Sequence, residues 1–255
     1  MCLRVVSCYF PTVTDGRAIV LGGSGALGGV IARRLSAAGM RVGLTFHRGE
    51  ARARALEAEL GCVVAPLDAT RPGDVERAID ALVTALGGPP DALVHAIAIA
   101  STVSPARFDR VQEVDDAGWD RLMAVNVKSA FFAVKHAAPL MRGRGGNVVL
   151  LGSIDGEKSV PTTAPYAVSK AALAGIARAL AKELGPSNVR VNVVAPGILE
   201  GGISALVPEE VRAEYLKHSG AKRYGTFAEI AEVVAWLAQS NTYVTGRSIL
   251  LDGGV

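Results

Sequence analysis

The chain has 255 residues, of which 50% are hydrophobic and 20% charged, a composition typical of a folded protein with a large core rather than a disordered one. Its 27 basic and 24 acidic residues are interspersed and leave a net charge of +3, so no basic surface for nucleic acid is expected. The cysteines, Cys2, Cys8 and Cys62, suit neither a disulfide framework nor a zinc site, and no apolar run is long enough to cross a bilayer. We therefore expect a cytoplasmic protein without a metal site, with a tail over residues 1–15 and one domain over residues 16–255.

Short β-type runs alternate with segments of helical periodicity along the whole chain. Residues 92–100 are apolar except for His95, which is typical of a strand buried on both faces of a parallel sheet. The alternation predicts an α/β fold, a single Rossmann-like doubly wound parallel sheet of about seven strands flanked by helices. The expected strands are 17–21, 41–46, 63–66, 92–100, 147–152, 189–195 and 248–251, and the expected helices are 30–38, 50–60, 74–86, 117–142, 166–184 and 227–239.

A glycine-rich turn, residues 22–29, joins the first expected strand to its helix. Glycines at this place let the backbone approach a pyrophosphate, and the N-terminus of the helix favours its negative charge. The alternative is a tight strand-to-helix connection that binds nothing. The residues of the turn that we expect to bind a dinucleotide are Gly22, Ser24, Gly25, Ala26, Leu27 and Gly28.

The residues after the second and third strands predict which dinucleotide is bound. An acidic residue after the second strand would accept from the adenosine ribose, whereas this chain has His47 and Arg48, which favour the extra phosphate of NADPH over NADH. A solvated surface arginine is the alternative for Arg48. After the third strand, Asp68 is placed to accept from the adenine amino group and is followed by Ala69, although Asp68 could equally cap the next turn.

Three residues form a candidate catalytic set. Tyr166 follows Ser153 by thirteen residues, and Lys170 follows Tyr166 by four, which places the last two on one face of a helix. A phenol is a poor acid or base at neutral pH, and a neighbouring ammonium favours its ionised form and so brings proton transfer within reach. Ser153, at the end of the preceding strand, can hydrogen-bond the same substrate oxygen. The alternative is a core tyrosine, a surface lysine and a capping serine.

These motifs, with others in the same order, resemble the short-chain dehydrogenase/reductase family, and within it the 3-oxoacyl-acyl-carrier-protein reductases. The resemblance covers about residues 17 to 254. Besides Ser153 and the YAVSK sequence from Tyr166 to Lys170, it rests on Asn126 within WDRLMAVNVK, on NVVAPG from residue 192, on Arg223-Tyr-Gly225, and on YVTGR and LDGG near the end.

The resemblance implies a role for each of four residues, Asn126, Ser153, Tyr166 and Lys170, which we call the tetrad. Tyr166 would donate a proton to a carbonyl oxygen that Ser153 holds, while Lys170 binds the nicotinamide ribose and tunes Tyr166. Asn126 would hold a water that relays protons to Lys170. Ala96, Pro196, Gly197 and Ile198 would complete the cofactor site, and the family implies a homotetramer packed through the helices that carry Asn126 and Tyr166 and through the last strand.

The chain departs from the family pattern at several positions. Ala26 stands where the family has a glycine, and Gly25 stands where many NADP-dependent members have a basic residue. Ile198 occupies a position where the family often has a threonine that binds the nicotinamide carboxamide. Residues 95–100, HAIAIA, resemble enoyl-acyl-carrier-protein reductases instead, but Thr163 occupies the position of their active tyrosine. His95 is either a catalytic base or, as is more common for a buried histidine, a hydrogen-bonded structural residue.

We therefore predict an NADPH-dependent ketoreductase that acts on a 3-oxoacyl thioester or a polyketide-type ketone in fatty acid or polyketide biosynthesis. The alternatives are an enoyl-thioester reductase of the same fold and a non-catalytic NAD(P)-binding module. Residues 199–222 are expected to form a substrate lid hinged at Gly201 and Gly202, with an ordinary surface insertion as the alternative. Candidate acyl-pocket residues are Val207, Pro208, Tyr215 and Leu216, and candidate basic residues for an acyl carrier protein, unless they are simply solvated, are Lys128, Arg142, Arg144 and Lys182.

Overall fold

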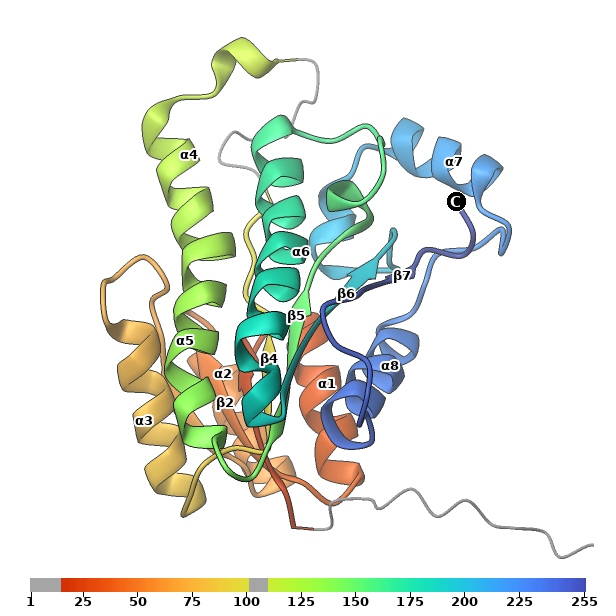
Figure 1. The fold of residues 1–255 in the computed structure, drawn as a ribbon. Helices are drawn as coiled ribbons and strands as arrows, with labels where there is room; N and C mark the ends of the chain where they lie inside the picture. Colours follow the sequence, from red (N-terminus) through yellow and green to blue (C-terminus); the bar gives the residue numbers. More distant parts are fainter. Residues whose placement is uncertain (1–14, 101–109) are drawn as a thin grey trace, which may run out of the picture.

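A computed structural model describes residues 15–100 and 110–255 of the chain. They form a seven-stranded parallel sheet in the order β3-β2-β1-β4-β5-β6-β7, which confirms the predicted doubly wound α/β fold (Figure 1). The expected tail, residues 1–15, lies outside the described residues except for Asp15, as do Cys2 and Cys8. The strands are β1 (Arg17–Leu21), β2 (Arg41–Phe46), β3 (Val63–Pro66), β4 (Ala92–His95), β5 (Gly146–Leu151), β6 (Val189–Pro196) and β7 (Ser248–Leu251).

Helices cover both faces of the sheet. One apolar cluster joins it to α1, α2 and α8, and a second joins its other face to α3, α5 and α6. No helix of the described residues is long and apolar enough to cross a membrane. The helices are α1 (Ala26–Ala37), α2 (Glu50–Leu60), α3 (Asp74–Leu86), α4 (Asp116–Met123), α5 (Ser129–Met141), α6 (Ala164–Leu184), α7 (Glu209–His218) and α8 (Phe227–Gln239).

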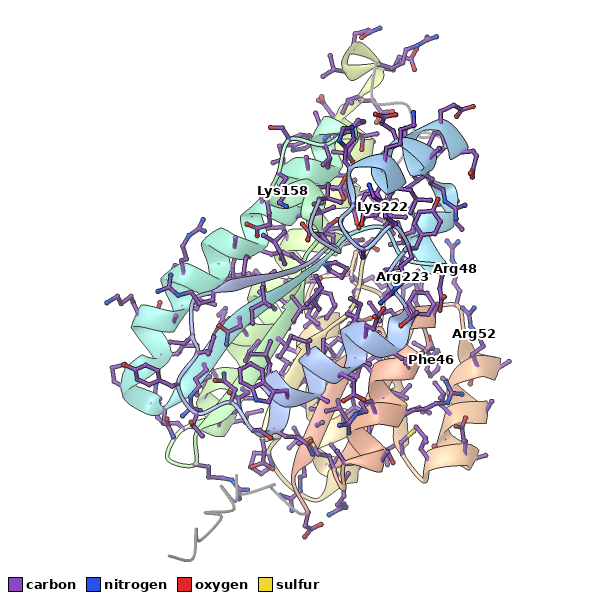
Figure 2. All side chains as sticks on the ribbon, turned by 90° about the vertical axis from the view of Figure 1, so that its right-hand side faces the viewer. Phe46, Arg48, Arg52, Lys158, Lys222 and Arg223 are labelled. Carbon is purple, nitrogen blue, oxygen red and sulfur yellow. The ribbon has the colours of Figure 1, made fainter. Side chains whose placement is uncertain are left out.

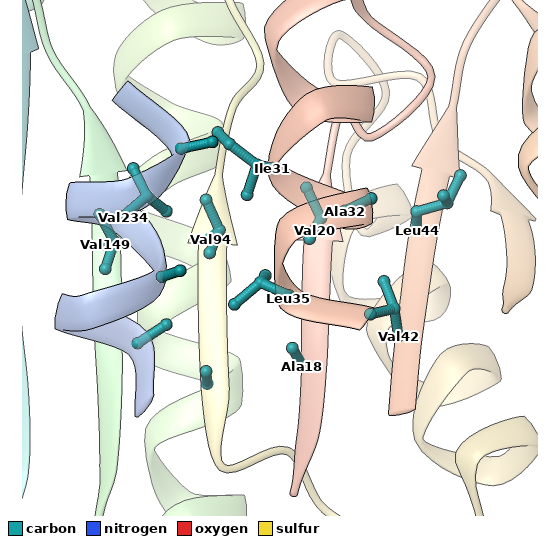
Figure 3. Close-up of a cluster of buried hydrophobic side chains, with 14 of the residues drawn as sticks. Ala18, Val20, Ile31, Ala32, Leu35, Val42, Leu44, Val94, Val149 and Val234 are labelled. Atoms are coloured by element: carbon teal, nitrogen blue, oxygen red, sulfur yellow. The ribbon is translucent and has the colours of Figure 1, made fainter. Parts of the chain in front are cut away.

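The core explains why the central strands lack polar alternation. Val20 of β1 and Val94 of β4 are fully buried beneath Leu35 of α1 and Val234 of α8 (Figure 3). The neighbouring side chains of the same strands are buried against the opposite helical layer. Because both faces are covered, most positions of the central strands are apolar, and each fully buried large side chain contributes about 1.5–3 kcal/mol of transfer free energy.

Three expected elements differ from the structure by more than two residues. The helix predicted over residues 30–38 begins at Ala26. The strand predicted over residues 92–100 ends at His95, and the helix predicted over 117–142 is divided by a π-helical segment, Ala124–Lys128. The last two differences involve Asn126, whose side chain binds the backbone N–H and C=O of Ile99. Those two groups are therefore unavailable for a strand ladder, and π-helical turns are frequent at functional sites.

Candidate active site

A cavity of about 640 Å³ lies at the carboxyl edge of the sheet, where β1, β4, β5 and β6 end. The structure brings most of the predicted site residues to its wall. Those that line it are Gly25, Ala26, Leu27, Gly28, Ala96, Ser153, Tyr166, Lys170, Pro196, Gly197 and Ile198.

Ser153, Tyr166 and Lys170 come together on this wall. Ser153 follows β5, and its hydroxyl accepts from the backbone N–H of Asp155, which begins a 3-10 turn over Ile154–Gly156. Tyr166 lies in the first turn of α6 and Lys170 one turn later, with its ammonium 5.7 Å from the centre of the Tyr166 ring. Lys170 Nζ also donates to the carbonyl oxygen of Leu151 at 2.8 Å, which fixes the ammonium between β5 and α6.

The pKa values of the two titratable groups move in opposite directions. Burial, with a smaller effect of the Asp155 carboxylate, raises the pKa of Tyr166 above its usual value, while the Ser153 hydrogen bond opposes this shift. Burial lowers the pKa of Lys170 to about 8, against the effect of Asp155, which raises it. The expectation that the Lys170 ammonium lowers the pKa of the phenol therefore does not describe the net effect, because desolvation of the phenolate is larger. A protonated Tyr166 is a proton donor at neutral pH.

Asn126 organises the segment after β4. Its Nδ2 donates to the carbonyl oxygen of Ile99 at 2.9 Å and to Ser169 Oγ at 3.0 Å, and its Oδ1 accepts from Ile99 N–H at 2.9 Å. Both amide protons are thus used by protein partners. A water bound by Asn126, as the family resemblance implies, would therefore have to donate a hydrogen bond to the side-chain or main-chain oxygen of Asn126.

His95 is fully buried and is absent from the cavity wall. Its Nε2 lies 2.7 Å from Ser129 Oγ, and since Ser129 donates to the carbonyl oxygen of Val125, Nε2 is the donor. Nδ1 has no hydrogen-bond partner among the described residues. Burial, together with the Lys170 charge, lowers the pKa of His95 to about 3 and keeps the ring neutral. This geometry favours the structural interpretation of His95 over a catalytic base.

The glycine turn fits the close approach of a phosphate group. Gly22 has φ of +81°, and a Cβ on Gly28 would lie 2.3 Å from the carbonyl oxygen of Gly22, so neither position accepts a side chain without rearrangement. Helix α1 begins at Ala26 after Gly25, which supplies no side-chain cap, so the first N–H groups of the helix are open to an anion. Ala26 is accommodated as the first helical residue.

The residues after β2 and β3 have different roles. Asp68 accepts from the N–H and the hydroxyl of Thr70, at 3.0 and 2.6 Å, so it does cap the following turn. These bonds are the main cause of its lowered pKa. His47 Nε2 lies 3.9 Å from Asp68 Oδ2, a loose contact at the surface. No described acidic residue pairs with Arg48, and Ala69 does not line the cavity.

Arg52, in the first turn of α2, is a candidate cofactor residue that sequence analysis did not identify. A Cβ placed on Gly49 would lie 3.0 Å from Arg52 Nη2 and 3.1 Å from Ser24 Oγ, so the guanidinium reaches back over Gly49 to the glycine turn. Arg54 pairs with Glu57 at 2.9 Å, whereas Arg52 has no acidic partner among the described residues. Figure 2 shows Arg48 and Arg52 near each other at the edge of the molecule. The four-residue spacing between them was the available signal.

The expected lid contains a 3-10 segment, Gly202–Leu206, and α7, a helix that was not predicted. Val207, Pro208 and Tyr215 line the cavity as expected, but Leu216 does not. The hydroxyl of Tyr215 donates to the carbonyl oxygen of Asp252 at 2.7 Å and lies where a Cβ on Gly197 would be. This contact joins α7 to the residues that follow β6 and β7.

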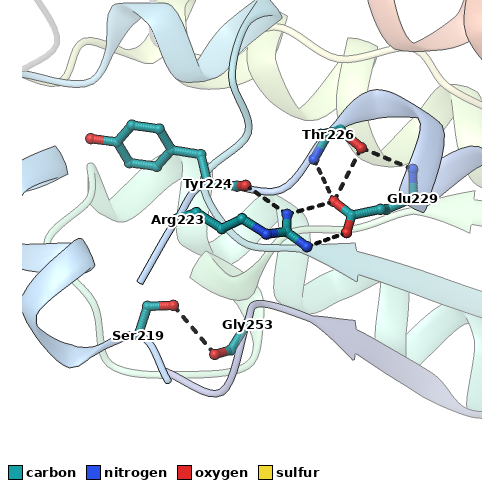
Figure 4. Close-up of polar contacts among 6 residues, drawn as sticks. All are labelled: Ser219, Arg223, Tyr224, Thr226, Glu229 and Gly253. Atoms are coloured by element: carbon teal, nitrogen blue, oxygen red, sulfur yellow. Dashed lines mark hydrogen bonds and ion pairs between the residues drawn. The ribbon is translucent and has the colours of Figure 1, made fainter. Parts of the chain in front are cut away.

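A polar network joins Arg223, which follows the lid, to the first turn of α8 (Figure 4). Arg223 forms two hydrogen bonds with the carboxylate of Glu229, at 2.9 and 2.5 Å, and Glu229 forms a capping box with Thr226. The guanidinium hydrogen bonds and the N–H of Thr226 lower the pKa of Glu229 to about 2. The network accounts for the arginine of the Arg223-Tyr-Gly225 motif, which directly follows the lid.

The basic residues expected near the cavity mouth are not placed there. Arg144 pairs with Asp91, which immediately precedes β4 and so lies at the amino edge of the sheet. Arg142 caps the C-terminal end of α5, and Lys182 lies in the last turn of α6, far along the helix from Tyr166. None of these residues, nor Lys128, lines the cavity. For Arg142, Arg144 and Lys182 the structure favours the alternative that these side chains are solvated surface charges.

Comparison with known proteins agrees with this geometry. Residues 23–255 match the family model described as Enoyl-(Acyl carrier protein) reductase. The 3-oxoacyl-[acyl-carrier-protein] reductase MabA of Mycobacterium tuberculosis is 33% identical over 247 residues, which cover 96% of this chain and 94% of MabA. A dehydrogenase/reductase from Sinorhizobium meliloti 1021 has a TM-score of 0.87 at 33% identity, with 95% of this chain and 96% of that chain covered. A blue fluorescent protein from a metagenomic library, solved in complex with NADPH, has a TM-score of 0.86 at 32% identity, with 95% and 98% covered.

Proposed function

Because the chain belongs to the short-chain dehydrogenase/reductase family of oxidoreductases, we propose that it is an NADPH-dependent ketoreductase acting on a 3-oxoacyl thioester or a polyketide-type ketone. The observation that carries the proposal is the placement of Ser153, Tyr166 and Lys170 on the wall of the cavity that also contains the glycine turn. A non-catalytic binding module has no need for this set of side chains. The same placement supports a reaction between a bound dinucleotide and a carbonyl group.

Tyr166 acts as the general acid in this proposal. When bound, NADPH supplies the hydride that reduces the carbonyl carbon. Tyr166, whose raised pKa keeps its proton on the phenol, donates that proton to the carbonyl oxygen. Ser153 holds the oxygen by a hydrogen bond, and Lys170, fixed by Leu151, supplies a positive charge beside the phenolate that forms. Asn126 keeps residues 96–100 against this wall.

The preference for NADPH rests on the basic residues beside the glycine turn. Arg48 and Arg52 would together hold the adenosine 2′-phosphate, with Ser24 next to them. The open N-terminus of α1 would hold the pyrophosphate. Arg52 thereby supplies the second positive charge that many NADP-dependent members place at the position of Gly25.

An enoyl-thioester reductase remains the second candidate, because the matched family model carries that description and residues 95–100 resemble such enzymes. Two features favour the ketone. Thr163 takes the position of their active tyrosine, whereas Tyr166 stands one helical turn before Lys170. His95 is buried outside the cavity and makes no contact that reaches a substrate.

The test follows loss of NADPH or NADH absorbance by the purified protein with acetoacetyl and crotonyl thioesters. Consumption of the acetoacetyl substrate with NADPH supports the ketoreductase. Consumption of the crotonyl substrate alone refutes it in favour of the enoyl reductase.

The assembly and location of the protein complete the proposal. Exposed apolar side chains on α5 and α6, Phe131 and Val168, and on and before β7, Leu250 and Tyr243, support a homotetramer packed through those elements, a state that light scattering would test. An acidic carrier protein in the cytoplasm would present the substrate, and the candidate basic residues for docking it are Lys158, Lys222 and Arg223, which Figure 2 labels.

A further inference from the structure

Asp155 is an acidic residue in the active site that the proposed mechanism does not use. It lies in the 3-10 turn after β5, two residues beyond Ser153, and lines the cavity. The hydroxyl of Ser153 donates to Asp155 Oδ2. The effect of its carboxylate on the pKa of both Tyr166 and Lys170 shows that it faces the reacting groups rather than solvent alone.

Asp155 and Glu214 are the acidic residues among those that line the cavity, and no described basic residue pairs with Asp155. Glu214 is bound by Lys217 and His218, at 2.8 and 2.9 Å, and Asp252 by Lys158 at 2.7 Å. Lys170 donates its hydrogen bond to Leu151 instead.

The cavity wall is largely apolar, with Val160, Leu206 and Val207 among its members. Asp155 is half-buried in this wall, and a carboxylate partly withdrawn from water is stabilised by each hydrogen-bond donor that reaches it. The only side-chain donor to Asp155 among the described residues is the Ser153 hydroxyl. The second oxygen of the carboxylate is therefore open to a donor from a ligand.

The bond between the two side chains also determines what Ser153 can offer a substrate. A serine hydroxyl has one proton, so its donation to Asp155 competes with donation to the Tyr166 oxygen and to a substrate. A simple ketone gains the Ser153 hydrogen bond only by taking the proton from Asp155, which leaves the carboxylate without a donor. A ketone with its own hydroxyl on the adjacent carbon has no such cost, because its hydroxyl donates to Asp155 while its carbonyl accepts from Ser153.

We propose that Asp155 is a substrate-binding residue that selects ketones carrying a hydroxyl donor on the carbon next to the carbonyl. The two adjacent oxygens of such a substrate match the two adjacent groups, the Ser153 hydroxyl and the Asp155 carboxylate. This inference rests on the proposed ketone reduction and narrows its substrate class. A purely apolar 3-oxoacyl chain fits the cavity wall but leaves Asp155 unused.

The test compares 1-hydroxy-2-hexanone, 1-methoxy-2-hexanone and 2-hexanone as substrates of the purified protein with NADPH. The methoxy ketone keeps the electron-withdrawing oxygen of the hydroxy ketone, is larger by one methyl group and has no proton to donate. We expect kcat/KM for the hydroxy ketone to exceed that for the methoxy ketone by about tenfold or more, the usual effect of a hydrogen bond to a charged group. A ratio near one in the wild-type protein overturns the inference.

Substitutions at Asp155 test whether this residue causes the preference for the hydroxy ketone over the methoxy ketone. Asp155→Val should bring the ratio close to one, and because the ratio compares two substrates of the same variant, it is independent of any change in the overall rate that the loss of the carboxylate beside Tyr166 and Lys170 causes. Asp155→Asn, which keeps an acceptor oxygen without the charge, should give an intermediate ratio and serves alone if the valine variant does not fold. Glu157→Gln is the matched control, since Glu157 is an acid of the same segment that does not line the cavity, and it should leave the ratio unchanged.

The outcomes separate this inference from the proposed function. An unchanged ratio in Asp155→Val overturns the role of Asp155, as does reduction of the acetoacetyl thioester without any reduction of the hydroxy ketone. Both results leave the ketoreductase intact. A folded wild-type protein that binds NADPH but reduces none of these ketones overturns the proposed function itself.

Discussion

Replacement of Arg52 by glutamine tests whether the two arginines beside the glycine turn form the phosphate site. Arg52 reaches over Gly49 toward Ser24, and it contacts neither a core residue nor an acidic partner in the described parts of the chain. The substitution therefore removes a charge without removing packing. The free energy of unfolding should change by no more than about 0.5 kcal/mol, as for other surface substitutions.

The expected loss of NADPH affinity follows from the exposure of the Arg52 side chain. A hydrogen bond to a charged group contributes about 1.5–3 kcal/mol, and solvent and salt weaken it at an exposed side chain such as Arg52. A loss of about 1–2 kcal/mol corresponds to a roughly 5- to 30-fold higher Kd for NADPH. Affinity for NADH, which lacks the phosphate, should stay within about twofold. The same change at Arg48 should act in the same direction, and the double variant should bind both cofactors about equally.

The measurement is the Kd of each cofactor from its fluorescence change on binding, at low and at physiological salt. Arg54→Gln is the control, because Arg54 belongs to the same helix but is occupied by Glu57 and Glu50. It should leave both Kd values unchanged. An equal loss of NADPH and NADH affinity in Arg52→Gln would refute the reasoning, since it would show damage to the turn rather than loss of a phosphate contact.

Three further predictions concern the tetrad, the turn and the buried histidine. Tyr166→Phe should lower kcat by at least about 100-fold and leave the Kd for NADPH nearly unchanged, and surviving turnover would show that another group is the acid. Gly28→Ala should weaken NADPH binding more than tenfold, as judged by the same fluorescence titration, because the added methyl would lie 2.3 Å from the Gly22 oxygen. His95 has a folded pKa of about 3 against 6.5 unfolded, so the unfolded state binds the proton first and stability falls as pH drops through this range, by about 2 kcal/mol at pH 5. In urea unfolding at pH 7 and pH 5, His95→Asn should lose this part of the acid sensitivity, and an unchanged loss would contradict the assignment.

Local patterns determined the architecture of this protein. The alternation of apolar strands with amphipathic helices predicted the doubly wound sheet, and the bounds of α2, α3 and α8 agree with their periodic segments. The spacing of Ser153, Tyr166 and Lys170 placed all three on one wall, because a strand end and the first turns of the following helix meet at one edge of the sheet. Such features depend on residues close together in the chain, so the sequence alone contains them.

Tertiary contacts decided where β4 ends, which arginine is left without an acidic partner and how the pKa of Tyr166 shifts. The strand expected to reach residue 100 ends at His95 because Asn126, from a distant helix, takes the backbone groups of Ile99. Arg52 differs from Arg54 only in what lies opposite it in space. The net shift in the pKa of Tyr166 depends on burial, which spacing does not reveal. The sequence by itself determined the order of the strands and the spacing of Ser153, Tyr166 and Lys170, whereas the environment of each side chain, on which pKa, specificity and partner contacts depend, was decided only when distant segments packed together.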